Sequence, residues 1–139
     1  MSFLLDTNVL SEARKRQAAD TRVKAWLGSV ASTDLFTSVV VVGEIRRGVE
    51  RLRRRDVAQA TLLEAWLATL KRQFSDRVLS VTLEIAEEWG RLNVPDPLPT
   101  IDAYLAATAR VHRLTLVTRN TPDLARTGVT LLNPWLPAA

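Results

Sequence analysis

Four carboxylates stand where one expected element ends and the next begins, and together they could hold a metal ion. They are Asp6, Glu44, Asp102 and Asp123. Asp6 directly follows the apolar run Phe3-Leu4-Leu5, which predicts a buried strand. In open α/β sheets, ligands are held outside the carboxyl ends of the strands, so we expect the four side chains to converge there.

The expected chemistry follows from the ligand types. Several carboxylates brought close together repel one another, and at neutral pH they need cations or protons to coexist. Oxygen ligands select hard cations, so the cluster predicts Mg²⁺, with Mn²⁺ as the other candidate. The chain has no cysteine, and His112 is its only histidine, which argues against thiolate metal sites, cysteine nucleophiles and a Ser-His-Asp triad.

Each acid also has an explanation that involves no function. Asp6 could cap a helix, and Asp102 would be favoured by the helix dipole in a first turn. Glu44 could pair with Arg47 or Arg51 at helical spacing. The fourth acid lies beside a proline in a turn, where aspartate is common. What favours a site is the occurrence of all four at expected junctions beside the sheet.

The segments between the acids predict strands that alternate with helices. Strands are expected at 3–5, 35–38, 78–81, 114–117 and 129–132. Helices are expected from a cap at Thr7 or Asn8, over 21–29, from Ser38 or Val39 to Leu52, over 56–73, from a cap at Thr82 to Leu92, and over 101–111 with Thr100 as the cap. Apolar strands without alternation indicate a parallel sheet covered on both faces. We therefore expect an α/β fold, a three-layer α/β/α sandwich with four or five parallel strands.

Length and composition limit the number of domains, the location and the class of partner that we expect. A chain of 139 residues, 47% apolar, is expected to form a single domain over 1–139. It has no apolar run of roughly 18 residues, the length a membrane span needs, and no basic region precedes its first apolar run. We therefore expect no membrane association and a cytoplasmic location. Arginine supplies 16 of the 19 basic residues at a net charge of +4, which suits a polyanionic partner.

Five segments together resemble the PIN-domain family, and more specifically VapC-type toxins of toxin–antitoxin pairs. They are Leu4 to Glu12, Val42 to Gly48, Ile101 to Ala109, Leu116 to Asn120 followed by Asp123, and Asn133-Pro134-Trp135. The resemblance covers nearly the whole chain. The Ser-Glu pair after the first motif and the Asn-Pro-Trp ending resemble the FitB branch of the family.

The resemblance implies a metal-dependent ribonuclease and assigns roles to individual residues. Asp6, Glu44 and Asp102 match the three core acids of the family. Relatives carry the fourth acid at the position of either Asn120 or Asp123, and this chain has the acid only at Asp123. The supporting polar positions are matched by Asn8, Thr118 and Asn120.

The same resemblance implies partners. It predicts a cognate VapB-like antitoxin, an RNA substrate, a homodimer, and a heterotetramer or larger assembly with the antitoxin. Separately from the resemblance, three arginines near the expected crevice could hold the RNA backbone, namely Arg46, Arg47 and Arg119. The basic run Arg51 to Arg55 has two interpretations, an RNA-binding segment or a solvated helix end favoured by the helix dipole.

Two rival functions stay open on the sequence alone. One is a catalytically inactive PIN-like module that binds nucleic acid or a partner without cutting, which the amide at Asn120 allows. The other is a phosphatase or nucleotide hydrolase on a similar sheet. The second is disfavoured because the five glycines form no phosphate-cradling loop.

Overall fold

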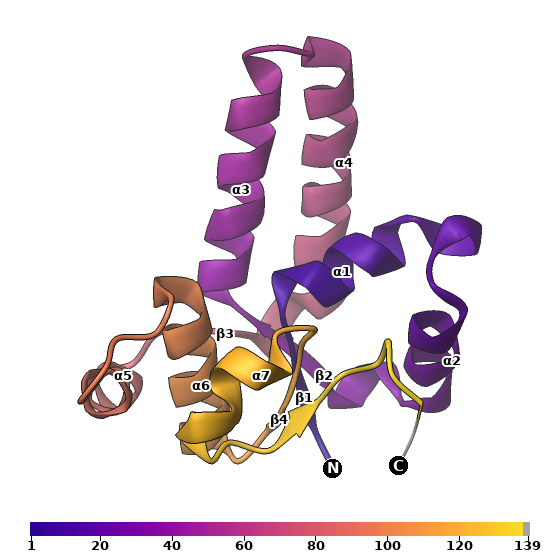
Figure 1. The fold of residues 1–139 in the computed structure, drawn as a ribbon. Helices are drawn as coiled ribbons and strands as arrows, with labels where there is room; N and C mark the ends of the chain where they lie inside the picture. Colours follow the sequence, from indigo (N-terminus) through magenta and orange to yellow (C-terminus); the bar gives the residue numbers. More distant parts are fainter. Residues whose placement is uncertain (138–139) are drawn as a thin grey trace.

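A five-stranded parallel sheet forms the centre of the protein (Figure 1). The structure is a computed structural model that describes residues 1–137. The strands are β1 (Phe3–Leu5), β2 (Leu35–Ser38), β3 (Val78–Leu79), β4 (Thr115–Val117) and β5 (Leu131–Leu132). They lie in the order β3-β2-β1-β4-β5, and every neighbouring pair is parallel. The expected parallel sheet is confirmed, with five strands.

Helices flank the sheet and complete the expected three layers. They are α1 (Thr7–Arg14), α2 (Thr21–Ser29), α3 (Val39–Arg53), α4 (Val57–Phe74), α5 (Leu83–Leu92), α6 (Thr100–His112) and α7 (Thr121–Leu124). Four 3₁₀ turns cover Arg16–Ala18, Ser32–Asp34, Ser75–Arg77 and Ala125–Thr127. In Figure 1, α5 and α6 lie on one side of the sheet and α1 and α2 on the other. No helix within residues 1–137 is long and apolar enough to cross a membrane.

The two middle strands and α6 form the centre of the core. All residues of β1 and β4 are buried, as unalternated apolar strands in a covered sheet require. Helix α6 buries five apolar side chains, Ala103, Leu105, Ala106, Ala107 and Ala109. Because four of these are alanines, the helix backbone can approach its neighbours closely. The first turn of α6, which carries Asp102, is thereby fixed beside the sheet.

Local capping differs from expectation at two helices. Helix α1 is capped by Asp6, whose side chain accepts a hydrogen bond from the Thr7 amide, and not by Thr7 or Asn8 as predicted. Helix α6 begins at Thr100 with Pro99 as its cap, so Thr100 is its first residue. Both differences move a helix start by one or two residues, because several polar residues in a row can each serve as a cap.

The two edge strands of the sheet, β3 and β5, are shorter than predicted. Strand β3 ends at Leu79, and β5 begins at Leu131, because only these residues pair with the neighbouring strands. The turn expected around Asp123 forms the short helix α7. The apolar pattern alone could not mark where the pairing stops.

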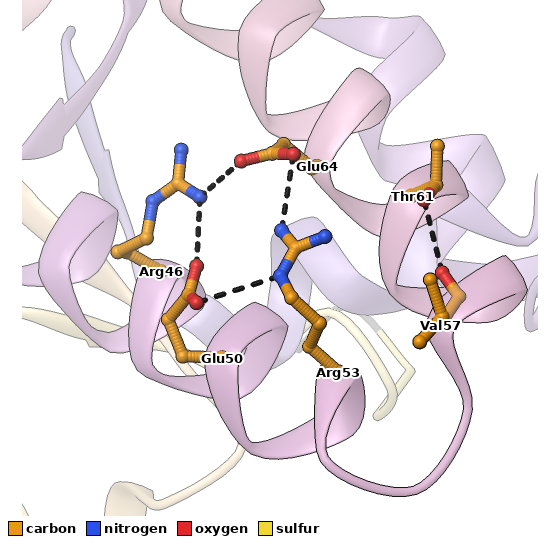
Figure 2. Close-up of polar contacts among 6 residues, drawn as sticks. All are labelled: Arg46, Glu50, Arg53, Val57, Thr61 and Glu64. Carbon is orange, nitrogen blue, oxygen red and sulfur yellow. Dashed lines mark hydrogen bonds and ion pairs between the residues drawn. The ribbon is translucent and has the colours of Figure 1, made fainter.

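Helices α3 and α4 form a hairpin that extends away from the sheet (Figure 1). Four ion pairs join its side chains in a closed ring (Figure 2). Glu64 of α4 accepts from Arg46 at 2.5 Å and from Arg53 at 3.0 Å, and Glu50 pairs with the same two arginines at 3.2 and 3.5 Å. The hydrogen bond from Arg46 is the main reason that the pKa of Glu64 is lowered. The ring links one face of α3 to α4.

Candidate active site

The order of the strands determines where a ligand would lie. Starting from β1, the chain adds β2 and β3 on one side and then returns to add β4 and β5 on the other. The direction therefore switches between β1 and β4, and ligands of open α/β sheets bind at such a switch point, outside the carboxyl ends of the strands. Asp6 follows β1 and Thr118 follows β4 at this point, and the Asp6 amide donates to the Val117 carbonyl at 3.1 Å.

Asp6 is held in one orientation by three neighbours. The side chain is 4% exposed. Its Oδ1 accepts from the Thr7 amide at 2.6 Å, and its Oδ2 accepts from the Thr118 hydroxyl at 2.7 Å and from the Asn8 amide group at 3.3 Å. Burial raises the pKa of Asp6, and the hydrogen bond from Thr118 acts in the opposite direction. Asp6 is thus a buried, oriented carboxylate as well as a helix cap.

Glu44 lies in the second turn of α3 and faces the same region. The hydroxyl of Thr7 donates a hydrogen bond to its Oε1. Among residues 1–137, Glu44 takes part in no ion pair, so the alternative pairing with Arg47 or Arg51 does not form. Sequence reasoning missed the Thr7–Glu44 contact, for which the only signal was a hydroxyl residue directly after Asp6.

The electrostatics of Asp102 show that the acids act on one another. Asp102 is 8% exposed. Burial, followed by the negative charges of Asp6, Glu44 and Asp123, raises its pKa to about 6. A hydrogen bond from the Asn120 side chain opposes this rise. All three other predicted acids are therefore within electrostatic reach of Asp102, with Asp123 on the exposed rim in α7.

Thr118 connects both ends of the site. Its side chain is fully buried, and its hydroxyl donates a hydrogen bond to Asp6. The same Oγ1 accepts hydrogen bonds from the backbone amide of Asn120 at 3.1 Å and from the side chain of Asn8 at 3.4 Å. The three residues predicted as supporting therefore form one hydrogen-bonded group around the first acid. This group connects the start of α1 with the segment after β4.

The donor set fits a hard divalent cation in its chemistry. The two buried acids, Asp6 and Asp102, have no basic ion-pair partner in the described part of the chain, and unpaired buried carboxylates are costly. Only oxygen ligands are present, as Mg²⁺ prefers. In residues 1–137, no three such side chains are already arranged closely enough to hold an ion. To bind an ion, these carboxylates would have to move closer together.

The three arginines predicted to contact substrate have different surroundings. Arg46 is engaged in the ion-pair ring of the hairpin. Arg47 is exposed on α3. Arg119 directly follows Thr118, and its guanidinium carbon lies 4.7 Å from the centre of the Trp135 ring. Arg47 and Arg119 are thus better placed than Arg46 to contact a phosphate.

We expect the metal-free protein to lose stability as the pH rises between about 4 and 6. The pKa of Asp102 is raised in the folded state, from 3.8 to about 6, so its stabilising contribution is complete below the unfolded value and disappears through the folded one. About 1.4 kcal/mol per pKa unit, reduced by solvent screening at the open side, gives a loss of the order of 1–2 kcal/mol. Urea unfolding with a chelator at several pH values measures it.

The matched control for this titration is Asp102→Asn. The difference in unfolding free energy between wild type and this variant cancels the contributions of acids that do not interact with Asp102, and it keeps the titration of Asp102 with its coupling to Asp6, Glu44 and Asp123. As the pH rises, the unfolding free energy of the wild type should fall relative to that of the variant. Added Mg²⁺ should raise it again. A difference that is flat between pH 4 and 7 would show that Asp102 ionises normally.

Comparison with known proteins identifies the family. The family profile described as "PIN domain" matches residues 3–129. Toxin FitB of Neisseria gonorrhoeae is 33% identical over 141 residues, covering 96% of this chain and 98% of that protein. VapC ribonuclease Y4jK of Sinorhizobium fredii is 32% identical over 144 residues, covering 98% and 99%.

Solved structures agree with this result. The crystal structure of FitAcB from Neisseria gonorrhoeae matches with a TM-score of 0.86 and 32% identity, covering 96% of this chain and 98% of that chain. A toxin–antitoxin complex from Klebsiella pneumoniae matches with a TM-score of 0.68 and 26% identity, covering 96% and 98%. The predicted resemblance is confirmed: the chain belongs to the PIN-domain family.

Proposed function

We propose that the protein is a metal-dependent endoribonuclease and the toxin of a toxin–antitoxin pair. The observation that carries the proposal is the pair of buried acids without basic partners, Asp6 and Asp102, at the switch point of the sheet. The names of its relatives, a toxin and a VapC ribonuclease, support the same activity. RNA phosphodiester bonds are the proposed substrate.

Asp6 and Asp102 would hold Mg²⁺ directly, with Mn²⁺ as a substitute, and Glu44 and Asp123 would complete the site through water or a second ion. A bound divalent ion lowers the pKa of a water ligand and stabilises charge that develops on a phosphate.

The remaining residues would position these acids and the substrate. Thr118 and Asn8, which donate hydrogen bonds to Asp6, would fix its orientation. Thr7 fixes Glu44 in the same way. Arg119 would contact the RNA backbone, because guanidinium groups form paired hydrogen bonds to phosphate. Arg47 would contribute in the same way from α3, whereas Arg46 would first have to leave its ion pairs.

The proposed partners follow from the family and its relatives. A VapB-like antitoxin would bind the toxin and block the site, and the toxin would form a homodimer and a heterotetramer or larger assembly with it. The match to a solved toxin–antitoxin complex supports this partner class. Co-expression with the gene that precedes this one, followed by purification, would test for the complex.

The decisive experiment is metal-dependent cleavage of RNA. Protein freed of metal with a chelator should leave an end-labelled structured RNA intact, and Mg²⁺ or Mn²⁺ should restore cutting. Calorimetric titration of the same preparation should show divalent binding. RNA binding without divalent binding and without cutting would instead support the alternative, an inactive PIN-like binding module.

A further inference from the structure

Helix α3 presents three different faces along its length. At 100° per residue, its buried apolar face contains Val41, Ile45 and Val49. A second face contains Arg46, Glu50 and Arg53, which form the ion-pair ring with Glu64 (Figure 2). A third face begins at Glu44, which accepts the hydrogen bond from Thr7 of α1.

The third face carries a row of arginines that continues from the candidate site. From Glu44, steps of three and four residues lead to Arg47 and Arg51 on one side of α3, and a further step of three reaches Arg54, which caps the C-terminus of the helix with a helical backbone conformation. We call these three residues the arginine track. Their side chains are exposed, and within residues 1–137 none of them takes part in an ion pair or a side-chain hydrogen bond.

The helix dipole does not account for this row. Cations are favoured near a helix C-terminus, which would explain Arg51 and Arg54 but not Arg47, since Arg47 lies two turns before the end. The ring, by contrast, shows what the chain does when it compensates an arginine: Arg46 and Arg53 each contact two carboxylates. The arginine track has no such carboxylate partners among residues 1–137.

We propose that the arginine track binds successive phosphates of an RNA strand that leaves the carboxylate site along α3. Arg54 lies ten residues beyond Glu44, which corresponds to about 15 Å along the helix. Guanidinium groups at this spacing suit a polyphosphate backbone, and contacts to the backbone position a strand without reading its sequence. The direction from the site outward rests on the proposed ribonuclease function, whereas the phosphate contacts can be tested without it.

The test measures RNA binding with a protein that cannot cut. In an Asp6→Asn background, the double variant Arg51→Gln/Arg54→Gln is compared with Lys71→Gln/Arg72→Gln. Both variants remove two positive charges from exposed positions of the same hairpin, but Lys71 and Arg72 lie at the end of α4 next to the sheet. The probe is a fluorescent single-stranded RNA of mixed sequence, titrated at several salt concentrations. Circular dichroism and the melting temperature confirm that both variants are folded.

The track variant should bind RNA roughly ten- to thirtyfold more weakly at about 0.1 M salt. The slope of log affinity against log salt should fall by about 0.7 for each lost contact, or about 1.4 in total. The control variant should stay within about twofold of the background, because the end of α4 leads to the amino end of β3, whereas the carboxylate site lies at the carboxyl ends of the parallel strands. Equal affinities and slopes for the two variants would overturn the proposal.

Two further experiments distinguish RNA binding by the arginine track from binding of an acidic protein segment and from the proposed ribonuclease function. Poly-L-glutamate serves as a second probe: if the track variant loses binding to it while RNA binding is unchanged, the face belongs to an acidic protein segment and the RNA proposal is wrong. Cleavage by the protein with native Asp6 is measured separately. Absence of cleavage would contradict the proposed function. The difference between the two variants in the slope of log affinity against log salt would still decide whether the arginine track binds phosphates.

Discussion

Replacing Asp6 with asparagine should lower RNA cleavage at least about a hundredfold while the fold is retained, because it removes one charged ligand of the proposed ion. Asparagine has nearly the same shape and can still cap α1. The free carboxylate is also costly in its buried position, as its raised pKa shows, so the substitution should leave the stability of the metal-free protein unchanged or increase it. Single-turnover cleavage in Mg²⁺ and urea unfolding in chelator measure the two effects.

The control for this substitution is Asp76→Asn. Asp76 is exposed in the turn before β3, so its replacement removes the same charge without touching the site. It should leave cleavage within about twofold of wild type, since surface charges contribute little. If Asp6→Asn preparations free of contaminating nuclease cut as fast as this control, Asp6 is a helix cap and nothing more.

Replacing Thr118 with valine should lower cleavage about ten- to a hundredfold, because hydroxyls that orient a metal-binding carboxylate have effects of this size. Valine matches the shape of threonine but cannot donate to Asp6 or accept from the Asn120 amide. The lost bonds are buried, so stability should fall by about 1–3 kcal/mol. Loss of the Thr118 hydrogen bond should also raise the pKa of Asp6 further.

Thr118→Ser separates the hydroxyl from the packing. Serine keeps the oxygen and loses one buried methyl group, which costs about 1 kcal/mol of stability. Cleavage should therefore recover in the serine variant although its stability does not fully recover. Steady-state rates over a range of Mg²⁺ concentrations show whether the valine variant needs more metal. Equal cleavage by the valine and serine variants would mean that the hydroxyl does not orient Asp6.

Local patterns were enough to locate most elements of this fold. The helix over Thr21–Ser29 and the strand over Leu35–Ser38 have the predicted bounds, because polar caps and short apolar runs mark their ends. Asp6 was identifiable as a candidate for the same reason, because a charged residue directly after a buried run is conspicuous. The parallel sheet followed from strands that lack alternation.

Contacts between distant segments could not be predicted in this way. Helical spacing offered Glu44 only partners on its own helix, whereas its observed partner, Thr7, is 37 residues away in sequence. Arg46 was expected to contact the RNA backbone as one of the arginines near the crevice. Its ion pair with Glu64 depends on how α3 packs against α4, which one helix does not reveal. The pKa of Asp102 likewise depends on the segments that carry Asp6, Glu44 and Asp123.

The position of β1 in the sheet has a consequence for synthesis of the protein. This first strand is bordered by β2 on one side and by β4 on the other, so one edge stays open until residue 117 has been made. The hydrogen bond that orients Asp6 joins residues 112 positions apart in the sequence. Such long-range pairing forms late. A growing chain on the ribosome therefore lacks the Thr118 contact that orients Asp6 until β4 and the residue after it have been made.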